Sequence, residues 1–190
     1  AFMGKLYYTP IDPLYLSASY YDSGSLKNQT PEMSIAGLTS RPSGVTDWQR
    51  RAWEVDARYD FKKGKKPLDP PAYSDSKAIL RLSYGRFHDI TSIASAGRAG
   101  NFGFAEGTYN LTKKFYTAGR YSFVNLDGGE TTATLNSVTA NRYTRYSLGV
   151  GYRWSENTIL KLGYDWNKQS GSNTEEADDD LLSAIVATQF

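Results

Sequence analysis

The feature that most constrains how this chain can fold is a period-two alternation of apolar and polar side chains. It is clearest in TRYSLGVGYRW, residues 144–154, where Thr, Tyr, Leu, Val, Tyr and Trp alternate with Arg, Ser, Gly, Gly and Arg. After the short turn SENT, the segment ILKLGYDWNK repeats the alternation. Successive side chains of a β-strand point to opposite faces. These residues therefore predict a β-hairpin with one apolar face and one polar face.

The same alternation recurs upstream, whereas a helical period of 3.6 is found nowhere convincingly. Most of the segments run to ~10 residues or more, longer than the ~5–6 usual in globular sheets. A strand of this length, tilted by ~45°, spans the hydrocarbon layer of a membrane. We predict about nine strands, near residues 1–9, 14–23, 48–62, 76–88, 101–111, 115–126, 142–154, 158–168 and 180–190.

The connections between these strands alternate in length. TPIDP, NLTKK and SENT are short, whereas residues 24–47, 89–100, 127–141 and 169–179 are long and polar. The segment 61–75 breaks the rule, being long where a short turn is due. Short turns on one side and long loops on the other are typical of outer-membrane barrels. The fold class predicted is therefore all-β, an antiparallel transmembrane up-and-down β-barrel.

Composition narrows the function. Fifteen Tyr, four Trp and eight Phe are an excess of amphipathic aromatics, although the mean hydropathy is −0.55. Such aromatics favour interfaces that are apolar on one side and wet on the other. The absence of Cys excludes disulfides and thiolate metal sites, and we expect no cofactor. A net charge of +2 with no basic run gives no indication of nucleic-acid binding.

If the apolar face meets lipid, the polar face lines the lumen. Rings of Arg and Lys in a lumen favour anions or hydroxyl-rich solutes. The alternative is a wall of salt bridges that stiffens the barrel, because unpaired ions in a dry interior are unfavourable. The pore-lining residues predicted on this basis are Lys5, Glu54, Asp56, Arg58, Asp60, Lys77, Arg81, Glu106, Arg120, Arg145, Arg153, Lys161 and Asp165.

The chain closes with LLSAIVATQF, in which Phe190 is preceded at every second position by Thr188, Val186, Ala184 and Leu182. This segment resembles the C-terminal strand of Gram-negative outer-membrane β-barrels, and with the hairpins the whole chain looks porin-like. The resemblance implies that the barrel-assembly machinery reads Leu182, Val186 and Phe190. It also implies a trimeric or monomeric diffusion channel in the outer membrane, in contact with lipid and lipopolysaccharide, and made with a cleaved signal peptide.

Strand direction predicts that residues 1–190 form a single barrel region, incomplete at its N-terminal side. A last strand that ends at the periplasmic rim requires the first strand to run downwards into TPIDP. A complete bacterial barrel has an even strand number. About nine strands, with the first running down, are therefore expected to be the C-terminal part of a larger barrel.

The other candidate sites do not indicate an enzyme. His88 is the single histidine, and its strand parity places it on the lipid side. No Ser or Asp partner of a catalytic kind accompanies it in the pattern. The acidic run EEADDD at 175–180 lacks the spacing of a calcium loop, and KKGKK at 62–66 is interpreted as a charged turn. Trp48, Trp53, Trp154 and Trp166 are interpreted as girdle residues.

The function predicted is passive diffusion of small hydrophilic solutes, with anions as the candidate class. One alternative is a non-conducting barrel that sheathes or anchors a partner protein, such as an electron conduit or surface assembly. A second alternative is a soluble lipocalin-like barrel, which would need its apolar face inside. Conductance separates the first alternative from a channel, and partitioning into detergent separates the second.

Overall fold

The computed structural model describes residues 1–27, 47–61, 77–91, 98–127, 142–155, 157–170 and 180–188. These residues form one antiparallel sheet, and no helix long and apolar enough to cross a membrane occurs among them. The strands are β1 (Phe2–Ile11), β2 (Leu14–Asp22), β3 (Leu26–Lys27), β4 (Asp47–Asp60), β5 (Ala78–Thr91), β6 (Arg98–Asn110), β7 (Phe115–Leu126), β8 (Arg142–Arg153), β9 (Thr158–Ser170) and β10 (Leu181–Thr188).

Each strand of the main path pairs with its neighbour in sequence, in the order β1-β2-β4-β5-β6-β7-β8-β9-β10. This path confirms the predicted up-and-down sheet of about nine long strands. The two-residue strand β3, which pairs with β4, was not predicted. Strands β5 and β6 also extend further than expected at the ends they share. Backbone pairing continues there through polar residues because ladder hydrogen bonds do not depend on side-chain polarity.

The first turn is tighter than the predicted TPIDP. Strand β1 continues to Ile11, so that only Asp12 and Pro13 separate it from β2. The register shifts between Tyr8 and Ile11. Pro10 lies within this shift and has no N–H to donate to the ladder, which explains the irregularity.

The two faces of the sheet differ in exposure as the alternation predicts, but in the reverse sense to a soluble protein. Apolar-face side chains are open to the surroundings, with Leu148 56% and Val186 69% exposed. The buried hydrophobic side chains instead share the polar face, and they are Ile79, Phe87, Val124 and Ile159. A curved sheet crowds the side chains of its concave face, so we call the polar face the inner face and the apolar face the outer face.

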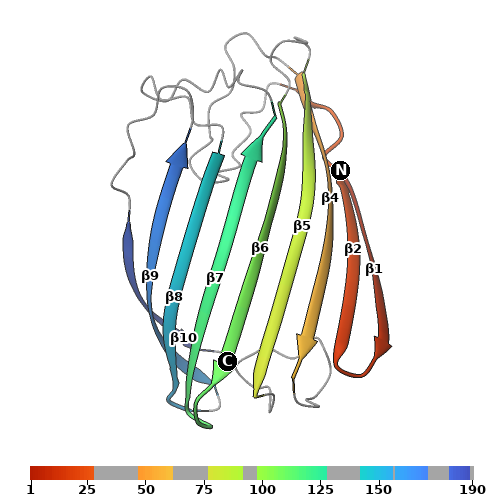
Figure 1. Ribbon diagram of the computed structural model, residues 1–190. Helices are drawn as coiled ribbons and strands as arrows, with labels where there is room; N and C mark the ends of the chain where they lie inside the picture. The colour runs from red at the N-terminus through yellow and green to blue at the C-terminus, as the bar shows by residue number, and fades with distance from the viewer. Residues whose placement is uncertain are drawn as a thin grey trace.

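Figure 1 shows the curvature: β10 passes behind β8 and β9. The turns β1–β2, β6–β7 and β8–β9 lie at the lower end of the sheet. We call this the short-turn end and the opposite one the long-loop end. Within the described residues the sheet is open, because β1 pairs only with β2 and β10 pairs only with β9.

Aromatic rings lie over glycines of neighbouring strands and fix the register. A Cβ at Gly85 would lie 2.5 Å from Phe102 Cζ, and one at Gly103 would lie 3.1 Å from a ring carbon of Phe123. Phe102 lies on the inner face and Phe123 on the outer face. Glycine is required at these positions because the rings occupy the space of a side chain. This explains why the parity of Phe102 and Phe104 differs from that of Tyr109.

Candidate functional site

The inner face carries nearly all the charged residues that the sequence singles out. The register places them at inner-face positions from β1 to β9, apart from Lys77, which lies just before β5. Lys77 donates from Nζ to the backbone oxygen of Asn110 at 3.0 Å, and its Nζ lies 4.6 Å from the centre of the Tyr109 ring. Lys77 is therefore a rim residue of the short-turn end.

One register row crosses six neighbouring strands and has a charged residue on five of them. Glu106 lies at its middle and faces a guanidinium on each side. Its Oε1 is 3.4 Å from Arg81 Nη1, and its Oε2 is 3.7 Å from Arg120 Nη1. We call this the charged row; its members, from β4 to β9, are Arg58, Arg81, Glu106, Arg120, Ser147 and Asp165.

Several of the predicted charges form ion pairs. Arg58 Nε lies 3.1 Å from Asp60 Oδ1, with both side chains 9% exposed. Lys5 Nζ lies 3.3 Å from Asp56 Oδ2, which also accepts a 2.8 Å hydrogen bond from Ser17. These contacts are the kind that the stiffening alternative describes.

The two predicted arginines of β8, Arg145 and Arg153, make different kinds of contact. Arg145 donates to Asn167 Oδ1 at 2.7 Å and lies 3.9 Å from Asp165. Arg153 donates to Asn110 Oδ1 at 2.6 Å and to the Lys113 carbonyl at 3.0 Å. Arg153 therefore holds the β6–β7 turn at the short-turn end.

Next to the charged row the inner face is hollowed. The hollow has a volume of about 620 Å³ and is lined by residues from every strand between β5 and β10. Predicted residues supply its charges, which are Arg81, Glu106, Arg120, Lys161 and Asp165. Arg120 is 44% exposed there, against 9% for Arg58. The hollow therefore contains Arg120, a predicted cation that remains open to solvent.

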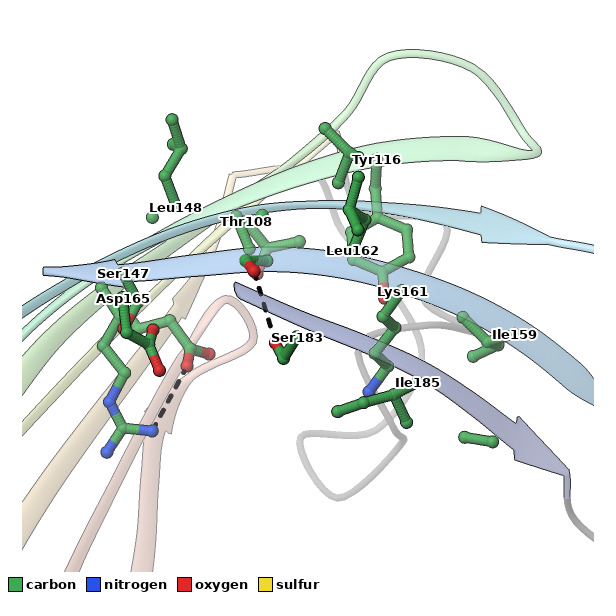
Figure 2. A pocket seen from close by; sticks show the side chains of 18 of the residues that line it. Thr108, Tyr116, Ser147, Leu148, Ile159, Lys161, Leu162, Asp165, Ser183 and Ile185 are labelled. Carbon is green, nitrogen blue, oxygen red and sulfur yellow. Dashed lines mark hydrogen bonds and ion pairs between the residues drawn. The ribbon is translucent and has the colours of Figure 1, made fainter. Parts of the chain in front are cut away.

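The floor of the hollow consists of small side chains. They belong to the register row on the short-turn side of the charged row, and in order they are Thr108, Ala118, Gly149, Gly163 and Ser183. Beyond this floor lie Tyr116, Lys161 and Ile185, which Figure 2 shows together with Ile159. Lys161 and Ile185 are register partners on adjacent strands.

A buried charged cluster at the long-loop end was not predicted. Arg50 donates two hydrogen bonds to the Asp89 carboxylate, from Nε to Oδ1 at 2.6 Å and from Nη2 to Oδ2 at 2.7 Å. The Arg50 guanidinium also lies 4.9 Å from the centre of the Phe87 ring. The two side chains are 5% and 3% exposed. The parity that places Glu54 and Ser83 inside extends to Arg50 and Asp89, and this was the available signal.

The remaining candidates are distributed as follows. Leu182 and Val186 lie exposed on the outer face of β10, whereas Phe190 lies outside the described residues. His88 is exposed at an outer-face position of β5. Residues 62–66 and 175–179 also lie outside the described residues.

The last residue of the acidic run is described. Asp180 accepts 3.0 Å hydrogen bonds from the Asn167 N–H and the Tyr164 hydroxyl. The described ranges contain no group of three His, Cys, Asp or Glu able to hold a metal.

Comparison with known proteins identifies the fold. No protein-family profile and no curated protein matches the chain. Among solved structures, the outer-membrane expressed OmpT of Vibrio cholerae is similar, with a TM-score of 0.57 at 14% sequence identity. The match covers 93% of this chain and 51% of that one, so this chain spans about half the length of that structure. The fold is that of the strands of an outer-membrane β-barrel.

Proposed function

We propose that the protein is an outer-membrane channel through which small hydrophilic solutes, anions in preference, diffuse passively. The observation that carries this proposal is the charged row beside a hollow on the inner face. A water-filled lumen stabilises charged groups that remain solvent-exposed on the concave face of a barrel wall, because unpaired ions in a dry interior are unfavourable. A water-filled lumen is a path for solutes.

The outer face supports placement in a membrane. Its large hydrophobic side chains are exposed on strand after strand, as Val55, Leu148 and Leu162 illustrate. Exposed apolar surface of this extent on a soluble protein favours aggregation, whereas lipid satisfies it. We accordingly propose as partners outer-membrane lipid, lipopolysaccharide and the barrel-assembly machinery, and no nucleic acid. A second copy of the chain, or a protein enclosed in the lumen, is compatible with this placement.

The preference for anions follows from the charges that line the hollow. Three cations, Arg81, Arg120 and Lys161, face two carboxylates, Glu106 and Asp165. A net positive wall raises the local concentration of anions and repels cations. The proposal involves no catalytic step and no cofactor, because diffusion requires only width and charge.

Single-channel recording of the full-length protein in planar bilayers tests this proposal. Open steps with an anion-to-cation permeability ratio above one are expected. The double variant Arg120→Gln, Lys161→Gln should lower that ratio, because both cations line the hollow. The control is Arg51→Gln, since Arg51 lies on the outer face and is 50% exposed. An inserted barrel that passes no current would refute the channel and favour the sheath or anchor.

A further inference from the structure

We propose that the hollow is a recess selective for small organic anions with a compact apolar body, such as short branched monocarboxylates. The inference rests on the proposed channel function and names its substrate class. In this arrangement the carboxylate of the solute lies against Arg120, on the charged-row side of the floor, and its hydrocarbon part lies over the glycine and alanine of the floor, toward Ile185 on the opposite side.

The depth of the recess comes from a gap in side-chain volume along each strand. On the inner face of β7, the small Ala118 separates Arg120 from Tyr116. On β9, Gly163 separates Asp165 from Lys161. At about 3.3 Å per residue, the four steps from Tyr116 to Arg120 place the Cα atoms of these two residues roughly 13 Å apart. A small solute fits within this distance beside the wall.

The two cations of the recess, Arg120 and Lys161, lie on opposite sides of its floor, and both remain accessible. The Arg120 guanidinium stacks 4.0 Å from the centre of the Phe104 ring, and Glu106 holds it from one side at 3.7 Å. The stacking fixes the plane of the guanidinium, while 44% of the side chain stays exposed. Lys161 is exposed and forms no ion pair with the residues that the structure describes. Either group can therefore accept a carboxylate without first losing a buried partner.

The apolar side of the recess is the unexpected part for a polar lumen. Ile185 lines it with 52% of its surface exposed, next to the buried Ile159. Ala187 and the Tyr116 ring continue this apolar lining. A wall that only passes water and inorganic ions has no need of exposed isoleucine. Contact with a hydrocarbon group removes this surface from water, which favours solutes that carry one.

Isobutyrate and lactate are suitable probes because they carry the same charge and differ at one group. Isobutyrate has a methyl group where lactate has a hydroxyl. Reversal potentials of the full-length protein in gradients of each sodium salt give their relative permeabilities. We expect isobutyrate to be favoured about two- to fourfold, the range set by one methyl group partly removed from water. In a lumen without the recess the ratio is about one.

Filling the recess should abolish this preference. Gly163→Ala adds a methyl group to the floor, and its Cβ would lie 3.4 Å from Ser183 Oγ, an ordinary contact. Gly163→Val fills more of the space. The matched controls are Gly107→Ala and Gly107→Val, because nothing lies within 4 Å of a Cβ at Gly107, which is on the outer face. Heat-modifiability on gels shows that each variant has folded.

The outcomes separate this inference from the channel proposal. An isobutyrate-to-lactate ratio that falls toward one in the Gly163 variants, but not in the Gly107 variants, supports the recess. A conducting, anion-preferring channel with a ratio of one, or with a ratio unchanged by Gly163→Val, overturns the recess and leaves the channel standing. A silent barrel overturns both.

Discussion

Two regions of the inner face have the same alternating pattern but differ in how completely their side chains fill the space. At the long-loop end, Arg50, Asp89 and Phe87 are packed until at most 5% of each is exposed. At the short-turn end, glycine and alanine leave a recess beside exposed cations. The inner face of one sheet is thus solid at the long-loop end of β4 and β5 and hollow toward the short-turn end of β7 to β10. Alternation decides which face a residue joins, and side-chain volume decides whether that face is filled.

The largest effect that would break this comparison is the removal of Asp89. Asp89→Ala leaves the Arg50 guanidinium buried without its carboxylate, which should lower the free energy of unfolding by about 3–5 kcal/mol. Urea unfolding in detergent, followed by tryptophan fluorescence, measures this free energy of unfolding. Arg51→Gln, at an exposed pair with Asp22, should change it by less than about 1 kcal/mol. Equal losses in the two variants would show that the long-loop end is not packed as described.

A pair of neighbouring residues sharpens the distinction between exposure to lipid and exposure to the lumen. Leu148 and Ser147 are adjacent on β8 and point to opposite faces. Leu148→Arg should destabilise the barrel in lipid by about 2–4 kcal/mol, because it places a charge on the lipid face. Ser147→Arg adds the same group to the charged row and should lack this penalty. The reverse order, measured by unfolding in lipid vesicles, would invert the assignment of the faces.

Two glycines offer a smaller test of filled against empty space. A Cβ at Gly85 would lie 2.5 Å from both Phe102 Cζ and the Trp53 carbonyl oxygen, so Gly85→Ala should destabilise by about 1–3 kcal/mol. Gly163→Ala, in the recess, should change stability by less than about 0.5 kcal/mol. Thermal unfolding of the two variants side by side checks the difference, and similar shifts would contradict it.

The smallest change concerns the carboxylate shared by two arginines. Glu106→Gln removes the negative charge between Arg81 and Arg120. The anion-to-cation permeability ratio should then rise about two- to fivefold at low ionic strength, as expected for one charge a few ångströms from the path. The rise should diminish in 1 M salt because of screening. A ratio that is unchanged at low salt would mean that solutes do not pass the charged row.

The sequence was sufficient to predict the sheet and the face of the charges it singled out, apart from Lys77 at the rim, because a period of two residues translates directly into geometry. Arg120 and Asp165 could be placed on the inner face from parity alone. Their partners could not, because partners depend on register between strands. Glu106 meets Arg81 and Arg120 only because β5, β6 and β7 align at these residues. Asp89 was missed because polar residues beyond a strand's apolar positions resemble the start of a loop.

The order of pairing has a consequence for how the sheet is built. Every strand of the main path is bonded to the strand that precedes it in the chain. Growth can therefore proceed one hairpin at a time, with a single advancing edge to protect from wrong partners. Each aromatic ring that lies over a glycine, as Phe102 does over Gly85, then favours the correct register of the arriving strand. A strand that arrives one residue out of step meets a side chain where the ring needs space.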